Sequence, residues 1–322
     1  MDLSAHVPRT VPARFELIDN RFAGVDGDAC LQVLFSAGRW LEGPVYVPAG
    51  RYVLFSDIPN DRVLRWDETT GAVGVFDHPA GYANGRTLDR AGRVVSCQHG
   101  HRRVVRTEHD GSVTVLASHH DGRRLNSPND VVERADGTIW FTDPSYGIDS
   151  DYEGHLAPSE IGACHVYRID PSGEMHIVAD DFERPNGLAF SIDEQQLYIG
   201  DSRRRHIRRF DVDDGGSLSG GDVFADCDAG SFDGLRLDCR RRVWAAAHDG
   251  LHCFDPDGTL LGKLHVPEVV SNLAFGGLRR NHLFITATTT LYTLRVNLSG
   301  ATYTAAGRPR HTKSPTAIHA PE

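Results

Sequence analysis

The sequence predicts an all-β fold, a six-bladed β-propeller with four antiparallel strands in each blade, and three observations support it. A hairpin that opens on an acid or an amide recurs six times, and it closes 15 residues later in five cases and 14 in the third. The openings lie 42, 45, 57, 47 and 39 residues apart. No helical pattern exceeds a turn or two. Short strands repeating with a period of about 45 residues are typical of propeller blades.

The first hairpin runs from Glu42 to Asp57. Its first strand contains Val45-Tyr46-Val47, the chain turns at 48–50, and the second strand covers 52–55. The other five share this plan. Their opening residue, turn and closing residue are Asn84, 91–92 and His99; Asn129, 136–137 and Asp143; Asn186, 192–194 and Asp201; Asp233, 237–239 and His248; and Asn272, 278–280 and Ala287.

A second hairpin follows the first in each blade. One example is the run 63–66 before the turn 67–71, where an Asp and a Gly between apolar strands favour a tight turn. The N-terminal segment adds two expected strands, at 15–18 and 31–35. We expect the last blade and this segment to share an outer strand and close the ring, so that no long sheet edge stays open. The predicted organisation is a loose arm over 1–14, a propeller over 15–307 and a disordered tail over 308–322.

Composition excludes several functions. The formal net charge of −10 argues against nucleic acid as a partner, because phosphate binding needs a basic face. No run approaches the roughly 20 apolar residues of a membrane helix, and the N-terminus lacks the apolar core of a signal peptide. We therefore expect no membrane association, a cytoplasmic location, free thiols and a monomer or weak homo-oligomer.

The hairpin geometry predicts two rings of side chains at one mouth of the central channel. The residue that opens the innermost strand and the residue that closes its antiparallel neighbour lie on the same face of the propeller. The inner ring is Glu42, Asn84, Asn129, Asn186, Asp233 and Asn272, and the outer ring is Asp57, His99, Asp143, Asp201, His248 and Ala287. Eleven of these twelve side chains can form hydrogen bonds and none is Lys or Arg, which favours a metal-binding mouth.

The expected ligands carry oxygen only. Glu42 and Asp233 supply carboxylates, and Asn129 and Asn186 supply carboxamides. Such a set favours one hard divalent cation, Ca²⁺ first, with Mg²⁺, Mn²⁺ or Zn²⁺ as alternatives. The competing interpretation is that Asn-Gly and Asp-Gly pairs are ordinary turn residues. The connection 144–163 is longer than its counterparts and should emerge on the same face, where Tyr146, Tyr152 and His155 could cover a ligand.

Several segments together resemble the gluconolactonase/regucalcin (SMP-30) family, over about residues 30 to 295. They are Leu41-Glu42-Gly43-Pro44, Leu125-Asn126-Ser127-Pro128-Asn129-Asp130, Trp140-Phe141-Thr142-Asp143-Pro144, Arg184-Pro185-Asn186-Gly187-Leu188 and Phe232-Asp233-Gly234-Leu235. Cys97-Gln98-His99-Gly100 makes the resemblance strongest for the bacterial gluconolactonase branch. One departure is Asn84-Gly85-Arg86, where that branch usually has a small or apolar residue after the glycine.

The resemblance implies a cation-dependent opening of sugar lactones, with Glu42, Asn186 and Asp233 as metal ligands. It also implies that Asn129 is a ligand or substrate contact and that Asp233 is the general base. A carboxylate bound to a cation is a poor base, so His99 or His248 could take the proton instead. We expect substrate contacts from residues around the mouth, namely Asn129, Asn126, Arg123, Asp143, Tyr146, Asp201 and His248.

Three alternatives remain open at this stage. The same mouth could hydrolyse phosphoesters or organophosphates, or the propeller could be a binding scaffold with a structural ion, since fold alone does not give function. A lactonase scaffold could also be used for an isomerisation or ring rearrangement. Neither the lactone nor its ring size can be read from the residues.

Overall fold

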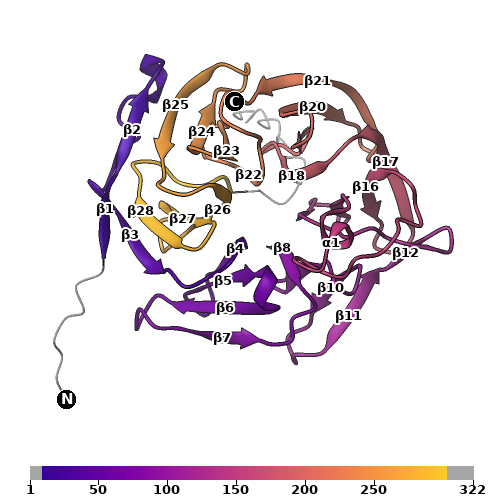
Figure 1. Ribbon diagram of the computed structural model, residues 1–322. Coiled ribbons are helices and arrows are strands. Elements are labelled where there is room, and N and C mark those ends of the chain that lie inside the picture. The colour runs from indigo at the N-terminus through magenta and orange to yellow at the C-terminus, as the bar shows by residue number, and fades with distance from the viewer. Residues whose placement is uncertain (1–8, 303–322) are drawn as a thin grey trace, which may run out of the picture.

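The computed structural model describes residues 9–302, and it confirms the six-bladed propeller. Six antiparallel sheets surround a central channel (Figure 1). In each sheet the first four strands or, in blade 6, the first three follow sequence order from the channel outward, and blades 5 and 6 take their outermost strands from the N-terminal segment. The innermost strands of neighbouring blades contact one another all the way round. In the described part of the chain, no helix is long and apolar enough to cross a membrane. All six cysteines are free.

The strands of each blade, from the channel outward, have these bounds. Blade 1 is β4 (Leu41–Val47), β5 (Tyr52–Asp57), β6 (Arg62–Asp67) and β7 (Val73–Asp77); blade 2 is β8 (Ala83–Leu88), β9 (Val94–Gln98), β10 (Arg103–Thr107) and β11 (Val113–Ala117); blade 3 is β14 (Val131–Glu133), β15 (Ile139–Asp143), β16 (Cys164–Ile169) and β17 (Met175–Phe182). Blade 4 is β18 (Pro185–Phe190), β19 (Gln196–Asp201), β20 (His206–Val212) and β21 (Leu218–Asp226); blade 5 begins with β22 (Leu235–Leu237), β23 (Val243–Ala247), β24 (Gly250–Phe254) and β25 (Leu260–His265); blade 6 begins with β26 (Val270–Gly276), β27 (His282–Ala287) and β28 (Leu291–Arg295).

The N-terminal segment completes two blades rather than one. As predicted, it closes blade 6, where β3 (Cys30–Phe35) pairs with β28 and β1 (Thr10–Pro12) pairs with β3. The structure adds β2 (Arg14–Leu17), which pairs with β25 as a fifth strand of blade 5 (Figure 1). The predicted loose arm over 1–14 is therefore wrong for its last residues, because strands form from Thr10 onward. Residues 1–8, the last residues assigned to the propeller (303–307) and the predicted tail (308–322) lie outside the described residues.

Apolar side chains fill the space between neighbouring blades. Trp140 of blade 3 packs edge-on against Phe190 of blade 4, with ring centroids 5.4 Å apart. Tyr46 of blade 1 stacks on Phe284 of blade 6 at 5.8 Å. The second strand of a blade is covered on both faces, which is why β23 reads Val-Trp-Ala-Ala-Ala and is wholly buried. The core is thus divided among the blade interfaces.

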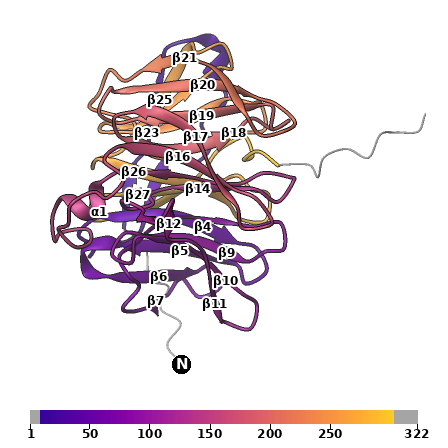
Figure 2. The same cartoon turned by 90° about the vertical axis from the view of Figure 1, so that its right-hand side faces the viewer.

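Short elements lie in the connections between the strands of the propeller. The one α-helical turn of residues 9–302, α1 (Tyr146–Asp149), lies in the long connection of blade 3 and sits at one face in the side view (Figure 2). The remaining elements are two 3₁₀ turns and a two-stranded ribbon, η1 (Asn20–Phe22), η2 (Ile58–Asn60), β12 (His119–His120) and β13 (Arg123–Arg124).

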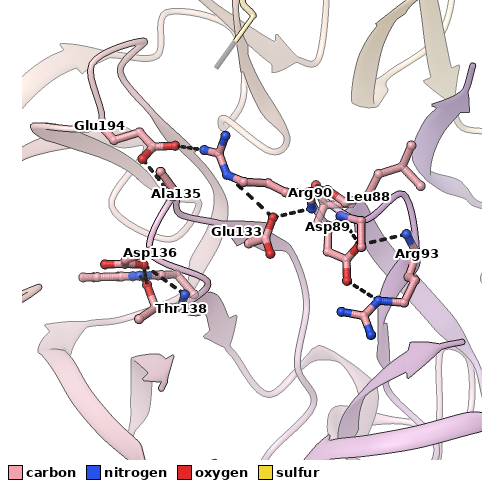
Figure 3. A network of polar contacts seen from close by, with 12 residues as sticks. Leu88, Asp89, Arg90, Arg93, Glu133, Ala135, Asp136, Thr138 and Glu194 are labelled. Atoms are coloured by element: carbon pink, nitrogen blue, oxygen red, sulfur yellow. Dashed lines mark hydrogen bonds and ion pairs between the residues drawn. The ribbon is translucent and has the colours of Figure 1, made fainter. Parts of the chain in front are cut away.

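A polar network joins the hairpin turns of blades 2, 3 and 4 (Figure 3). Arg90 follows β8, its backbone N–H donates to the Glu133 carboxylate at 2.6 Å, and its guanidinium pairs with Glu194 of blade 4. The second oxygen of Glu194 accepts from the backbone N–H of Ala135 in blade 3 at 2.8 Å. One arginine therefore connects three consecutive blades at the face opposite α1.

Candidate active site

The inner-ring residues lie where the innermost strands change register. The pairing of β4 with β5 shifts between Glu42 and Val45, and that of β8 with β9 shifts between Ala83 and Arg86. Blades 4 and 6 shift at the equivalent place. A bulge re-aims the side chain it carries and ends regular pairing. Glu42, Asn84, Asn186 and Asn272 thus belong to irregular strands rather than to turns, whereas Asn129 and Asp233 lie just before β14 and β22.

The glycine after the inner-ring residue permits close approach between blades. A Cβ atom on Gly43, whose φ is +49°, would lie 2.0 Å from the carbonyl oxygen of Asn84. The next glycine, Gly85, donates its N–H to the carbonyl oxygen of Asn129 at 2.8 Å. Only glycine combines a left-handed backbone with such a contact. These contacts fix each inner-ring residue relative to the one in the next blade.

Five of the six inner-ring residues meet around one cavity of about 200 Å³. Its lining is Trp40, Glu42, Asn84, Asn129, Tyr146, Glu153, Asn186, Ser202, Ser231, Asp233, His248, Val269 and Val270. Within residues 9–302, no Lys or Arg side chain lines it. The sixth residue, Asn272, lies behind Glu42 and donates to its carboxylate at 3.2 Å. We call this cavity the near mouth.

Three carboxylates face the near mouth without a basic partner. Glu42 is 3% exposed, and burial raises its pKa, with the charges of Asp130 and Glu153 adding to the effect. Burial also raises the pKa of Asp233, and the charges of Glu42 and Glu153 raise it further. Like charges that are buried together are costly unless a cation joins them. The charge of the site therefore fits a divalent cation held by oxygen ligands.

The amide of Asn84 supports the same interpretation. Its Nδ2 lies 3.1 Å from Nε2 of His99, and the other ring nitrogen of His99 lies 3.2 Å from the carbonyl oxygen of Glu153. A carbonyl only accepts, so Nδ1 of His99 donates to it and Nε2 accepts from Asn84. This arrangement leaves Oδ1 of Asn84 buried and without a hydrogen-bond partner. An orphaned amide oxygen on a cavity of carboxylates is a further ligand position for a hard cation.

His99 is behind the cavity rather than in it. The side chain is fully buried, both ring nitrogens are engaged, and burial lowers its pKa to about 4. A neutral imidazole that already holds Asn84 is not placed to take a proton from a substrate or water. Its predicted catalytic role is therefore replaced by an orienting one, while His248 does line the near mouth.

The long connection of blade 3 folds over the near mouth. Tyr146 and Glu153 line the cavity, and burial raises the pKa of Tyr146 to about 12 and that of Glu153 to about 7. Tyr152 instead stacks under the guanidinium of Arg39, and His155 packs against Tyr82. The loop is thus attached to blades 1 and 2 by Tyr152 and His155, and it presents Tyr146 and Glu153 to the cavity.

On the opposite wall, Asn186 is fixed by a chain of hydrogen bonds. Its Nδ2 donates to Oγ of Ser202 at 3.0 Å, and Ser202 donates to the carbonyl oxygen of Phe232 at 2.7 Å. Because the amide nitrogen donates to Ser202, this hydrogen bond fixes the orientation of the Asn186 carboxamide.

Most of the predicted outer ring is not at the cavity. Asp143 accepts from the backbone N–H groups of Asn126 and Ser127, both at 2.8 Å. Asp201 accepts from the backbone N–H groups of residues 183, 184, 203 and 204. Asp57 pairs with Arg62 at 2.8 Å and accepts from the N–H of residue 39. All three carboxylates are buried, and they fix loop backbones instead of facing the channel.

Two further predicted contacts also lie elsewhere. Asn126 is buried and donates to the carbonyl oxygens of Asp143 and Ala163, so it anchors the long connection. Arg123 is exposed in the ribbon strand β13 and does not line the near mouth. Sequence reasoning missed Trp40, Glu153, Ser202 and Ser231 as lining residues, and it assigned no ligand role to Asn84. The position of Asn84 in the repeat could have identified it as a ligand. Glu153 lies in a connection that does not repeat, so no spacing could have identified it.

Two acid and histidine clusters outside the channel already contain basic side chains. Asp170, Glu174 and His176 form one, and Arg168 lies 3.0 Å from Asp170. The other contains Asp228, Asp249 and His252, and the ammonium of Lys263 lies 2.7 Å from Asp228 and 3.2 Å from Asp249. Because a cationic side chain contacts each cluster, the near mouth is the better candidate for a divalent ion.

Comparisons with known proteins agree with this geometry. Residues 40–289 match the model of the SMP-30/gluconolactonase/LRE-like region. A gluconolactonase of Zymomonas mobilis is 30% identical over 302 residues, covering 86% of this chain and 84% of the relative. Pentonolactonase XacC of Haloferax volcanii is 28% identical, covering 79% and 84%. The solved structure of a gluconolactonase from Xanthomonas campestris is 36% identical with a TM-score of 0.83, covering 90% and 99%. With the matched region spanning every inner-ring residue, the chain belongs to the SMP-30/gluconolactonase/LRE-like family.

Proposed function

We propose that the protein is a divalent-cation-dependent lactonase that opens a sugar lactone at the near mouth. The observation that carries the proposal is the cavity of carboxylates and carboxamides that no Lys or Arg of residues 9–302 lines, in a chain related to gluconolactonases. The lactonase relatives support lactone hydrolysis as the reaction. The carboxylate and carboxamide oxygens of this chain support a bound cation.

Glu42, Asn186 and Asp233 would hold the ion, and Asn129 would be the fourth protein ligand. The all-oxygen set favours Ca²⁺, with Mg²⁺, Mn²⁺ or Zn²⁺ as alternatives. When bound, the cation polarises the lactone carbonyl and stabilises the negative charge that develops on its oxygen. Asn84 offers one more oxygen, because His99 keeps the amide nitrogen turned away.

The carboxylate of Asp233 is the proposed base. It accepts a proton from the attacking water, whose oxygen forms a bond to the carbonyl carbon. The bond between that carbon and the ring oxygen then breaks, and the ring oxygen takes the proton from Asp233 to become a hydroxyl, which regenerates the carboxylate. Burial and the neighbouring acids raise the pKa of Asp233 and so oppose the acidifying effect of the cation.

The remaining lining residues suit a hydroxylated substrate. Asn129, Tyr146, Glu153, Ser202 and His248 surround the acids and can donate to or accept from sugar hydroxyls. Trp40, Val269 and Val270 provide an apolar surface for the carbon face of a ring. A cavity of about 200 Å³ favours a single small sugar lactone over an extended ester.

The test is Asp233→Asn, assayed on a panel of aldonolactones with the metal content measured in the same samples. Asparagine keeps an oxygen ligand but cannot take the proton, so we expect the ion to be retained and kcat to fall by about 100-fold or more. Asp121→Asn is the matched control, because that side chain is 89% exposed. Retained metal with near wild-type turnover would remove Asp233 from the base role. A wild-type protein that opens none of the lactones with any of the four cations would overturn the proposed function itself.

A further inference from the structure

The two ends of the central channel are chemically opposite. The innermost strands run from the near mouth to a second cavity of about 530 Å³, which we call the far mouth. Its lining is Pro44, Val45, Tyr46, Pro48, Arg51, Arg86, Thr87, Leu88, Arg236, Leu237, Ala274, Phe275, Gly277, Leu278, Arg280, Gly300 and Ala301. The volume lies within the range of roughly 300–1,000 Å³ that is usual for small-molecule sites.

Positive charge gathers at the far mouth although the whole chain carries a formal charge of −10. Its lining contains four arginines and, within the described chain, no Asp, Glu, Lys or His. Arg51 and Arg236 are paired with carboxylates outside the lining, with Glu68 at 3.2 Å and with Asp130 at 3.3 Å.

Arg86 differs from these two because it donates hydrogen bonds to neutral acceptors. Its guanidinium donates to the carbonyl oxygen of Gly43 at 2.8 Å and to Oγ of Ser56 at 2.7 Å. The residue is 1% exposed, and within residues 9–302 it forms no ion pair, although the carboxylates of Glu42 and Asp130 act on it at longer range. A buried cation without a contacting counter-charge attracts an anion to the nearest open space. The departure from the family pattern at this position therefore places positive charge deep in the channel wall.

The rest of the far mouth is apolar. Pro44, Val45, Leu237 and Phe275 contribute to its walls, and Leu278 at the β26–β27 turn is 99% exposed. A fully exposed leucine beside a cavity of this kind offers apolar surface to a bound molecule. The walls thus suit a hydrocarbon body, and the arginines suit an anionic head.

We propose that the far mouth binds a small amphipathic carboxylate, with its head toward Arg86 and its apolar body against Phe275 and Leu278. The carboxylate would supply the closer counter-charge that Arg86 does not have among its hydrogen-bond partners. Hydrophilic anions would gain nothing from the apolar walls, and neutral or cationic amphiphiles would gain nothing from the arginines. Binding at the far mouth does not depend on lactone opening at the near mouth.

The experiment is calorimetric titration of the full chain with octanoate, octanol, gluconate and an octylammonium salt. We expect saturable binding of octanoate at millimolar concentration or below, and at least about tenfold weaker binding of the other three. Equal binding of octanol would overturn the anionic part of the proposal, and no binding of octanoate would overturn all of it.

Variants then locate the site. Leu278→Glu puts a like charge at the rim on an exposed side chain, and we expect octanoate binding to weaken by about tenfold. Leu17→Glu, on the outer strand of blade 5 and 55% exposed, is the matched control and should bind as the wild type does. Arg86→Met should abolish binding, and its melting temperature shows whether the fold is intact. Unchanged binding in Leu278→Glu would overturn the location. Binding that appears only after the chain is shortened to residue 302 would show that the chain's own end fills the far mouth, which would also overturn the proposal.

Discussion

At the scale of single residues, the near mouth depends on side chains that are held by their neighbours. Asn84 can offer its oxygen to the cavity because His99 binds the amide nitrogen, and His99 is held in turn by the backbone of the long connection. A carboxamide is otherwise free to rotate by half a turn and present its nitrogen. Partners of this kind commonly affect metal affinity or activity by about 10–100-fold.

His99→Phe should therefore lower kcat or cation affinity by about tenfold or more, because Asn84 loses the partner that orients it. His99→Gln can still accept from Asn84 and donate to the loop, so it should recover part of the loss. The pH dependence of the rate between about pH 5 and pH 9 separates orientation from proton transfer. Since burial lowers the pKa of His99 to about 4, the variants should keep the wild-type profile in this range. If the wild-type rate depended on a group that titrates near pH 6.5 and the variants lost that dependence, His99 would be the base after all.

Glu153→Gln tests the electrostatics of the long connection. Burial raises the pKa of Glu153 to about 7 from the 4.5 of the free side chain, so the native state favours the protonated form. Below pH 4.5 the side chain is protonated in both the folded and the unfolded state, and it does not change the free energy of unfolding. Between pH 4.5 and about 7 only the unfolded state loses the proton, so the folded state is increasingly destabilised, and above pH 7 this penalty is constant.

Glutamine carries no charge and removes that penalty. In cation-free protein we expect Glu153→Gln to raise the free energy of unfolding by about 1–2 kcal/mol at pH 8 and to leave it unchanged at pH 4, measured by denaturant titration. Glu174→Gln, with a side chain that is 72% exposed, is the control and should differ from the wild type by less than about 0.5 kcal/mol at either pH. A variant that is less stable than the wild type at pH 8 would mean that the negative charge of Glu153 stabilises the folded state.

At the scale of elements, the bulged inner strands and the turn network act at opposite faces of the same blades. Bulges in β4, β8, β18 and β26 turn polar side chains toward the near mouth. At the other face, Arg90 connects the turns of three blades through Glu133 and Glu194 (Figure 3). Blades that are fixed to one another at the turns keep the spacing of the inner-ring residues constant.

Arg90→Ala should lower the free energy of unfolding by about 1–3 kcal/mol, because the nearly buried Glu194 loses its ion pair. Replacing Glu194 with Gln in the same chain should recover part of that loss, which a double-mutant cycle measures by denaturant unfolding. Arg21 is the comparison, since it also pairs with acids of another segment but is 44% exposed. Arg21→Ala should cost less than about 1 kcal/mol. Equal costs for the two arginines would contradict a special role for the network.

At the scale of the whole molecule, the N-terminal segment determines how the ring is sealed. β3 and β1 complete blade 6, and β2 covers the outer edge of blade 5. Both blades otherwise end in an open strand, and open edges promote pairing with other chains. Closure by strands from the start of the chain also ties its first described residues to the last blades.

Removal of residues 1–18 should lower the melting temperature by about 5–10 °C, as expected for a loss of a few kcal/mol in a domain of this size or somewhat smaller. The edge of β25 would be open, so light scattering on heating should increase. The inner strands are untouched, and the lactonase rate well below the transition should remain within about twofold of the full chain if β1 and β2 only seal the outer edge. An unchanged melting curve would show that neither strand contributes to stability.

Residue spacing is enough to predict the architecture and the inner ring. The six repeats, their antiparallel hairpins and the lag of about 15 residues fix which end of each innermost strand carries Glu42, Asn186 and Asp233, because strand direction alternates regularly within a blade. The same regularity predicted closure by the N-terminal segment. These features are local or periodic, and periodic features can be read from residue spacing.

Which polar groups face the cavity depends instead on contacts between distant segments. Asp143 and Asp201 have the same phase as His248, yet backbone N–H groups from other loops take up their carboxylates, and no spacing within the hairpin encodes those loops. Glu153 reaches the near mouth from an aperiodic connection, and β2 pairs with a strand more than 240 residues away in sequence, Glu16 opposite Lys263. A side chain's direction depends on partners that folding brings from distant segments, so it is fixed by packing rather than by position in the repeat.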